Sequence, residues 1–245
     1  MRTGSRRLTT AIAVVASTFM LSGVVVSEAG AQTTALDPGT QAYIDAVKAS
    51  SKSYDISPEV QDKLINKALA GKPLDADRGV AAVSQSTQSV DGATVTRYVY
   101  ADGSVAVGSV QNPARPTTPA AAASPHSIQF CNETVNRDVH TLTNCLVKWN
   151  AATWSMDFRA SYDYYQFGEN LNGIVAVHVG GVGTINQIGS EIIVAHGDSA
   201  TWVSGEGHAV QMITIMGMGI TRSIGIRLKV NTRANPKAQE QGFGT

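Results

Sequence analysis

The sequence predicts a mostly β fold: a small α+β N-terminal module, a Pro/Ala-rich linker, and a C-terminal antiparallel β-sandwich or barrel. Three observations predict it. Two helix starts precede one hairpin pattern in the first half of the chain. Prolines and alanines then interrupt the sequence at 112–127. After them, apolar and polar residues alternate with the period of two that half-buried strands have.

Residues 1–31 are expected to be a signal peptide. Three arginines near the start precede an apolar stretch, and the small residues "AGA" at 29–31 supply a cleavage pattern. The alternative is a transmembrane anchor, since the apolar stretch is about long enough to span a bilayer. We expect cleavage after Ala31 and a secreted protein, extracellular or cell-wall associated, with no transmembrane span left after removal of the signal.

The charge balance argues against a nucleic-acid partner. The chain has 19 basic and 19 acidic residues. Without residues 1–31, which hold three of the basic and one of the acidic residues, 16 and 18 remain. There is no long basic run, whereas nucleic-acid binding depends on clustered Lys and Arg.

The segment 32–111 is predicted to hold two helices and a hairpin. Asp37 caps the first helix and Ser57 the second, and each is followed by proline at the first helical position. The stretches "TVTRYVY" and "SVAVGSV" then flank a turn at Asp102-Gly103. The core of such a segment is small, and its stability alone would be marginal.

Four prolines between 112 and 127 exclude a helix or a central strand and indicate a semi-rigid spacer. The remaining residues, 128–245, are predicted to form the all-β domain. "MDFRASYDYY" and "SIGIRLKV" alternate, and "SEIIVA" is expected to pair with "VQMITIM". "IVAVHV" at 174–179 is continuously apolar, which predicts a central strand. The residues after Thr232 are expected to be a tail.

Cys131 and Cys145 are the only cysteines. An even pair in an exported chain predicts a disulfide, and closing a loop of this size contributes about 3 kcal/mol in the chain-entropy model. The alternative is a metal site that also uses His140, but the cysteines lack the usual C-x-x-C spacing of such sites.

The "RYVYADGSVAVGSV" hairpin before a Pro/Ala linker, and "TNCLVKWN" before "FRASYDYYQ", resemble uncharacterised secreted proteins of actinobacteria. The resemblance extends over most of the chain after residue 31. It implies a bacterial, exported protein and brings no activity and no catalytic residues with it.

One candidate ligand site lies in "YDYYQFGENLN", where rings could stack on sugars while amides and carboxylates reach hydroxyl groups. Its residues are Tyr165, Phe167, Asp163, Glu169 and Asn170. The alternative is that the aromatic residues belong to the core, because Tyr162 and Tyr164 fall on the inward face of the strand.

A second candidate lies in "AHGDSATWVSGEGHA" at 195–209. His196, Asp198 and His208 are potential zinc ligands, but no recognised ligand spacing occurs, so the stretch is expected to be a turn region without metal. No G-x-S-x-G motif is present. We therefore expect no catalytic residues and no cofactor.

These observations favour a secreted, non-enzymatic binding or structural protein whose ligand is a cell-envelope polysaccharide or another extracellular protein. Two alternatives remain open. One is a secreted hydrolase or metal-dependent enzyme that uses the 196–208 loop. The other is a proprotein whose N-terminal module masks the C-terminal domain.

Overall fold

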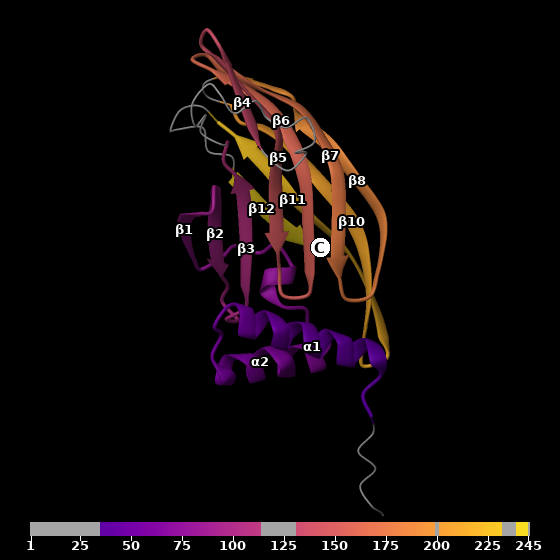
Figure 1. Ribbon diagram of the computed structural model, residues 1–245. Coiled ribbons are helices and arrows are strands. Elements are labelled where there is room, and N and C mark those ends of the chain that lie inside the picture. Colours follow the sequence, from indigo (N-terminus) through magenta and orange to yellow (C-terminus); the bar gives the residue numbers. More distant parts are fainter. Residues whose placement is uncertain (1–34, 114–130, 199–200, 232–238, 245) are drawn as a thin grey trace, which may run out of the picture. The chain divides into compact units, whose positions relative to one another are not determined.

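The computed structural model describes residues 35–113, 131–198, 201–231 and 239–244. From Leu36 onward they belong to one compact unit. The chain is mostly β, as predicted, with two helices followed by two antiparallel sheets (Figure 1). The predicted signal peptide and residues 114–127 of the predicted linker lie outside the described residues.

The two predicted helices are present as α1 (Pro38–Ser53) and α2 (Pro58–Leu69). The carboxylate of Asp37 accepts the backbone N–H of Thr40 at 3.0 Å, as an N-cap does. Ser57 occupies the cap position of α2 without a side-chain cap bond. Among the described helices, none combines the length and the apolar character that crossing a membrane requires.

The larger sheet has eight strands in the order β1-β2-β3-β5-β6-β7-β9, with β4 also paired to β5. Their bounds are β1 Ser84–Val90, β2 Ala93–Val99, β3 Val105–Gln111, β4 Asn132–Asn136, β5 Val139–Asn150, β6 Trp154–Tyr165, β7 Gly168–Gly181 and β9 His196–Asp198. The second sheet has the order β12-β11-β10-β8. Its bounds are β8 Thr184–Val194, β10 Val203–Ile215, β11 Met218–Val230 and β12 Gln239–Gly244.

The segments before and after the proline-rich stretch share one sheet. The predicted hairpin is formed by β2 and β3, and β3 pairs with β5 from Val107↔Asn150 to Val110↔Val147. The proline-rich stretch leads from β3 to β4, and both of these strands pair with β5. This pairing provides the additional core that a segment of two helices and a hairpin lacks on its own.

Several strands were not expected from the sequence, and β1 and β12 are the clearest cases. Every residue of β1, "SQSTQSV", is exposed, so no apolar alternation marks it. The expectation of a tail after Thr232 is wrong, because β12 pairs with β11 from Lys229↔Gln239 to Ile224↔Gly244. The sequence of β12, "QEQGFG", has no apolar alternation to mark a strand either, so its pairing with β11 is what defines it.

The expectation that "IVAVHV" is a central strand is also wrong. It belongs to β7, which pairs with β6 along its length but with β9 only at residues 168–170. Val175 is consequently 61 % exposed. The register with β6 shifts beside this stretch, and Ala176 has a positive φ of 53°. A bulge of this kind is common on edge strands, where it discourages pairing with other chains.

The predicted pairing of "SEIIVA" with "VQMITIM" is confirmed by β8 and β10. The turn between them is shorter than expected. Residues 196–198 form β9, and β10 already begins at Val203. Gly205 and Gly207 therefore lie within a strand and do not form turns.

The core lies between the inner faces of the two sheets. Met156, Phe158, Ala160 and Tyr162 of β6 are buried, as their alternation predicts. They belong to the same buried cluster as the alternating apolar residues of β11, which are Ile224, Ile226, Leu228 and Val230. A second cluster forms where the helices pack on the end of β10, at Ile213 and Ile215.

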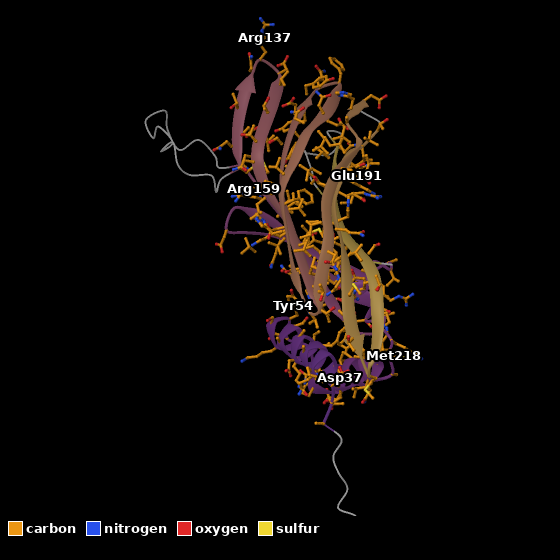
Figure 2. All side chains as sticks on the ribbon, turned by 90° about the vertical axis from the view of Figure 1, so that its right-hand side faces the viewer. Asp37, Tyr54, Arg137, Arg159, Glu191 and Met218 are labelled. Carbon is orange, nitrogen blue, oxygen red and sulfur yellow. A yellow bond between two sulfur atoms is a disulfide. The ribbon has the colours of Figure 1, made fainter. Side chains whose placement is uncertain are left out.

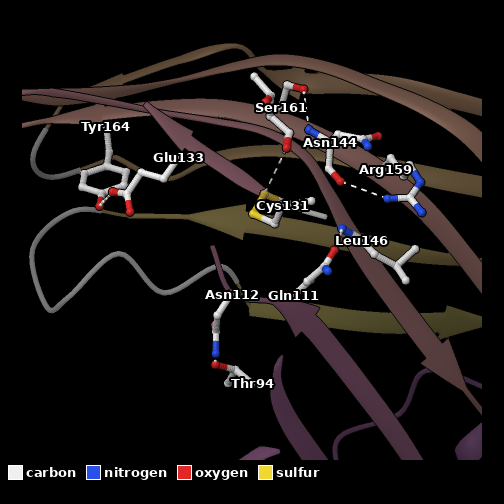
Figure 3. Close-up of a disulfide and its surroundings, with 12 residues drawn as sticks. Thr94, Gln111, Asn112, Cys131, Glu133, Asn144, Leu146, Arg159, Ser161 and Tyr164 are labelled. Carbon is white, nitrogen blue, oxygen red and sulfur yellow. Dashed lines mark hydrogen bonds between the residues drawn. A yellow bond between two sulfur atoms is a disulfide. The ribbon is translucent and has the colours of Figure 1, made fainter. Parts of the chain in front are cut away.

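Cys131 and Cys145 form the predicted disulfide, and both residues are fully buried (Figure 3). The bond ties the residue before β4 to β5. Beside it, Asn144 adopts a positive φ of 62°, and its carbonyl accepts a hydrogen bond from the Arg159 guanidinium at 3.1 Å. The two-cysteine metal alternative is excluded, because both sulfur atoms are used in the disulfide.

A buried polar network connects the helical segment to both sheets. The carboxylate of Asp77 accepts hydrogen bonds from the backbone N–H and hydroxyl of Thr153, at 3.1 and 2.8 Å, and from the hydroxyl of Tyr43 at 3.2 Å. Arg222 donates to Thr153 and Gln211, each at 2.8 Å, and lies 3.7 Å from Asp77. Burial, followed by the charge of Asp77, raises the pKa of Tyr43 well above its usual range.

Candidate functional site

The β4–β5 and β6–β7 hairpins turn at the end of the larger sheet that lies away from the helices (Figure 1). We call this region, residues 133–141, 162–170 and 195–198, the hairpin end. Figure 2 shows Arg137 at its tip, with Asp37 and Met218 at the opposite end. Arg137 makes the β4–β5 turn with a φ of 55°. β9 adds a fifth strand here by pairing with the start of β7.

Polar side chains form one continuous row across these five strands, which we call the polar row. The register pairs its members in sequence from β4 to β9: Thr134, Thr141, Asp163, Asn170 and His196. Directly paired residues of antiparallel strands place their side chains on the same face of the sheet. Four gaps of about 4.8 Å between strands make the row about 19 Å long.

Hydrogen bonds fix part of the polar row. The Nδ1 atom of His196 lies 2.8 Å from Oδ1 of Asn170, and the imidazole donates because an amide oxygen only accepts. Thr201 donates its hydroxyl to the Asp198 carboxylate at 2.9 Å and so holds the end of β9. Oδ1 of Asp163 is buried and has no hydrogen-bond partner among the described residues.

Two aromatic side chains lie beside the polar row. The hydroxyl of Tyr165 would be 2.8 Å from a Cβ at Gly168, which shows that this ring lies across the glycine. Tyr165 is thus packed against its own hairpin and is half-buried. Phe167 lies in the β6–β7 turn with 72 % of its surface exposed. The ring of Tyr165 is therefore held in place by its hairpin, whereas the ring of Phe167 projects into solvent.

The opposite face of the hairpin end has a different cluster. One carboxylate oxygen of Glu133 lies 2.6 Å from Nδ1 of His140 and accepts the hydroxyl of Tyr164 at 3.1 Å. The rings of His140 and Tyr164 are stacked, with centroids 4.6 Å apart and planes 7° from parallel. Burial and the charge of Glu133 raise the pKa of Tyr164 to about 12. Glu169 is on this face and is fully buried.

A third cluster lies on the second sheet. Glu191, Glu206 and His208 each offer a ligand atom, and these atoms all lie within 4.8 Å of one another. Among the described residues this is the only group of three metal-ligating side chains so close together. Arg227 occupies part of it, because its guanidinium donates to Glu206 at 2.7 and 3.1 Å. The imidazole of His208 lies over Gly189, where a Cβ would be 2.6 Å from Nε2.

The structure brings together residues from both predicted sites and separates others. Asp163, Tyr165 and Asn170 share one face with His196 and Asp198. Phe167 is at the tip and Glu169 faces inward. His208 lies on the other sheet, so the ligand set of His196, Asp198 and His208 is not assembled.

Thr134, Thr141 and Glu133 of the hairpin end were not singled out as site residues from the sequence, and His140 was considered only as a ligand of the two-cysteine metal site. Thr134 and Thr141 complete the polar row, and Glu133 and His140 complete the cluster on the opposite face. Side chains alternate between the two faces along a strand, so Thr141 and His140 lie on opposite faces. This alternation is the one sequence feature that could have assigned the two residues to different clusters. Their partners depend on the register of β4 and β6 against β5, which the sequence does not specify.

Comparison with known proteins finds no matching family model, no matching curated protein and no matching solved structure.

Proposed function

We propose that this protein is an exported, non-enzymatic binding module and that it holds a cell-envelope polysaccharide on the polar row. The observation that carries the proposal is the alignment of Thr134, Thr141, Asp163, Asn170 and His196 across five strands. A polysaccharide presents hydroxyl groups along its length, and the row presents hydroxyl, carboxylate, amide and imidazole groups along a line. The ring of Tyr165 adds an apolar surface for a sugar ring.

Rigidity supports a binding role. The members of the polar row are on paired strands, and sites on strands are held more precisely than sites on loops. A ligand that contacts the row therefore pays little conformational entropy on the protein side. The buried disulfide agrees with export, since such bonds form and persist in oxidising compartments.

The test is co-sedimentation with insoluble peptidoglycan, before and after removal of its attached polysaccharides. The double variant Asn170→Ala/His196→Ala removes two hydrogen-bonding groups, each contributing about 0.5–1.5 kcal/mol. We expect it to bind about 5- to 150-fold more weakly than the unmodified protein. The matched control is His178→Ala, an exposed histidine of β7 that is bonded to Asp157 outside the row.

Three outcomes would contradict this proposal. Equal binding by the double variant and the control would remove the polar row from the interaction. Loss of binding in Phe167→Ala, with the row variant unaffected, would place the contact at the exposed turn and favour a protein partner. Release of soluble sugar during the incubation would favour the hydrolase alternative. Circular dichroism should show that each variant is folded.

A metal-dependent function is the second candidate, and Glu191, Glu206 and His208 are the observation that favours it. We expect the purified protein to hold no stoichiometric metal, because the Glu206 carboxylate is already bonded to Arg227, whose positive charge opposes a cation. Elemental analysis checks this expectation. One equivalent of metal, retained in His196→Ala but lost in His208→Ala, would make the metal-dependent function the better proposal.

A further inference from the structure

One side of the sandwich consists of two strands that lack a neighbouring strand along most of their length. β8 is an edge of the second sheet, and β7 is an edge of the larger sheet beyond the short β9. Among the described residues, β8 pairs only with β10, and β7 after Leu171 pairs only with β6. Figure 2 views the molecule from this side, with Glu191 of β8 labelled. The backbone of such an edge can pair with another strand.

This side is apolar and almost without charge. Residues 171–194 include one acidic residue, Glu191, and no Lys, Arg, Asp or Pro, although Lys and Pro are what usually protects an edge strand. The opposite edge, β1, is polar, and its one exposed large apolar residue is Val90. On β7 and β8, four large apolar side chains are each at least 40 % exposed: Val175, Ile188, Ile192 and Ile193. Contiguous exposed apolar residues are typical of an interaction surface.

β8 is the strand of this side that is regular enough to pair. Its register with β10 is continuous from Gly189 to Ile192 and shifts on either side, at the positive φ of Gln187 and at Ile193. β7 is interrupted by the bulge at Ala176, which discourages pairing. A partner strand would therefore pair with the middle of β8.

The sequence of β8 is complementary to itself in one antiparallel register. With Ser190 on a two-fold axis, Ile188 of each copy lies opposite Ile192 of the other, and Glu191 lies opposite Gly189. With Glu191 on the axis, two carboxylates would face each other, and like charges directly opposite are destabilising. The register centred on Ser190 is thus the one that places isoleucine against isoleucine and separates the charges.

The size of this side also fits a second copy of the chain. β8 has 11 residues, so the side is about 36 Å long. Two sheets about 10 Å apart, with side chains on their outer faces, make it about 20 Å wide. It therefore offers about 700 Å², close to the roughly 800 Å² that each partner buries in a typical stable complex. Most homo-oligomers are two-fold dimers in which both copies use the same patch.

We propose that this protein forms a two-fold dimer in which β8 pairs antiparallel with β8 of a second copy, with Ser190 on the axis. The two four-stranded second sheets then become one sheet of eight strands. The exposed isoleucines of each copy are covered by those of the other. The dimer goes beyond the proposed binding function and does not depend on the polar row.

Sedimentation equilibrium of the full exported chain measures the association. We expect the mass of two chains at high protein concentration. Ile192→Lys should weaken the dimer by more than about 100-fold, because each substitution occurs twice in a two-fold interface and replaces a buried isoleucine by an ammonium group. Val90→Lys is the matched control: Val90 is on the other exposed edge and, like Ile192, is 40 % exposed, so we expect an unchanged dimer. Circular dichroism checks that both variants are folded.

Cysteine cross-linking tests the register. The two native cysteines form a disulfide, so an introduced cysteine is the only free thiol. In the proposed pair the Cβ atoms of Ser190 and its copy lie about 4.5–5.5 Å apart, close enough for a disulfide after small adjustment, whereas Glu191 and its copy are diagonal neighbours about 7–8 Å apart. Under mild oxidation we expect Ser190→Cys to become a covalent dimer and Glu191→Cys to stay largely uncross-linked.

A monomeric mass at every concentration would overturn the proposal. So would a dimer that survives Ile192→Lys and is lost in Val90→Lys, because the interface would then be β1, and so would assemblies that keep growing with concentration, because a two-fold pair closes. Cross-linking of Glu191→Cys in preference to Ser190→Cys would refute the register. Asn170→Ala/His196→Ala should dimerise normally, so a failure of the polar-row proposal is distinguishable from a failure here.

Discussion

Replacing Arg222 by methionine should lower the free energy of unfolding by about 3–5 kcal/mol, because it leaves the buried Asp77 carboxylate without its cation. Arg222 is 5 % exposed and Asp77 is fully buried. In a low-dielectric interior a single carboxylate is far more costly than an ion pair with satisfied hydrogen bonds. Methionine fills a similar volume, so loss of packing is a small part of the effect.

Urea denaturation at pH 7 measures this change. The matched control is Arg137→Met at the tip of the β4–β5 hairpin, where an exposed position predicts a change within about 0.5 kcal/mol. Adding Asp77→Asn to Arg222→Met should cost less than the sum of the two single substitutions, because the unpaired charge disappears. Additive effects would show that the two side chains do not stabilise each other.

The same experiment tests how the two halves of the chain depend on each other. Asp77 precedes the proline-rich stretch, whereas its partners Thr153 and Arg222 follow it. With β3 also paired to β5, we expect one cooperative unfolding transition in both the unmodified protein and Arg222→Met. Two separate transitions in the unmodified protein would show that the halves unfold independently.

The elements that the sequence predicted are those with a regular apolar pattern. The alternation of β6 and β11 is complete, and both contribute their apolar residues to the core. The helix α1 begins where Asp37 and Pro38 predict it to begin. In each case the local sequence and the packing favour the same structure, which is why local reasoning is sufficient.

The elements that the sequence did not predict depend on distant partners. β1 has no buried residue, and β12 follows a stretch without any apolar pattern. The run "IVAVHV" predicts a central strand because an edge strand seldom exposes such residues, yet β7 exposes Val175. Local sequence indicates how apolar a strand is, but its neighbours in the sheet are set by the whole topology.

The candidate site was predicted only in part for the same reason. Asp163 and Asn170 are close in sequence and face each other across one hairpin. His196 joins them only because β9 crosses to the larger sheet, while His208 stays on β10 in the second sheet. A shift of register between Ser161 and Tyr162 further decides which residues of β7 share the face of Asp163. A change of one residue in register moves a side chain to the opposite face, so the polar row follows from the register.

Replacing Gly205 by valine should lower the free energy of unfolding by about 3 kcal/mol, because side chains from β7 already occupy the space beside it. A Cβ at Gly205 would lie 2.6 Å from Cδ1 of Ile174, 2.8 Å from Cδ2 of Leu171 and 2.9 Å from the carbonyl oxygen of Glu191. The carbonyl belongs to the paired strand β8 and cannot turn away as a side chain can. To relieve these contacts, β10 would have to move away from β7 and from β8.

Gly219→Val is the matched control, since Gly219 is also a strand glycine but a Cβ there would meet nothing within 4 Å. Valine favours extended backbone, so we expect this variant to be within about 0.5 kcal/mol of the unmodified protein. Gly207→Ala should fall between the two, because its nearest neighbours are side-chain atoms of Phe158 and Met156 at 3.0 and 3.3 Å. If Gly205→Val were as stable as Gly219→Val, residue 205 would lie in an open turn, as the sequence alone suggests, and not against β7.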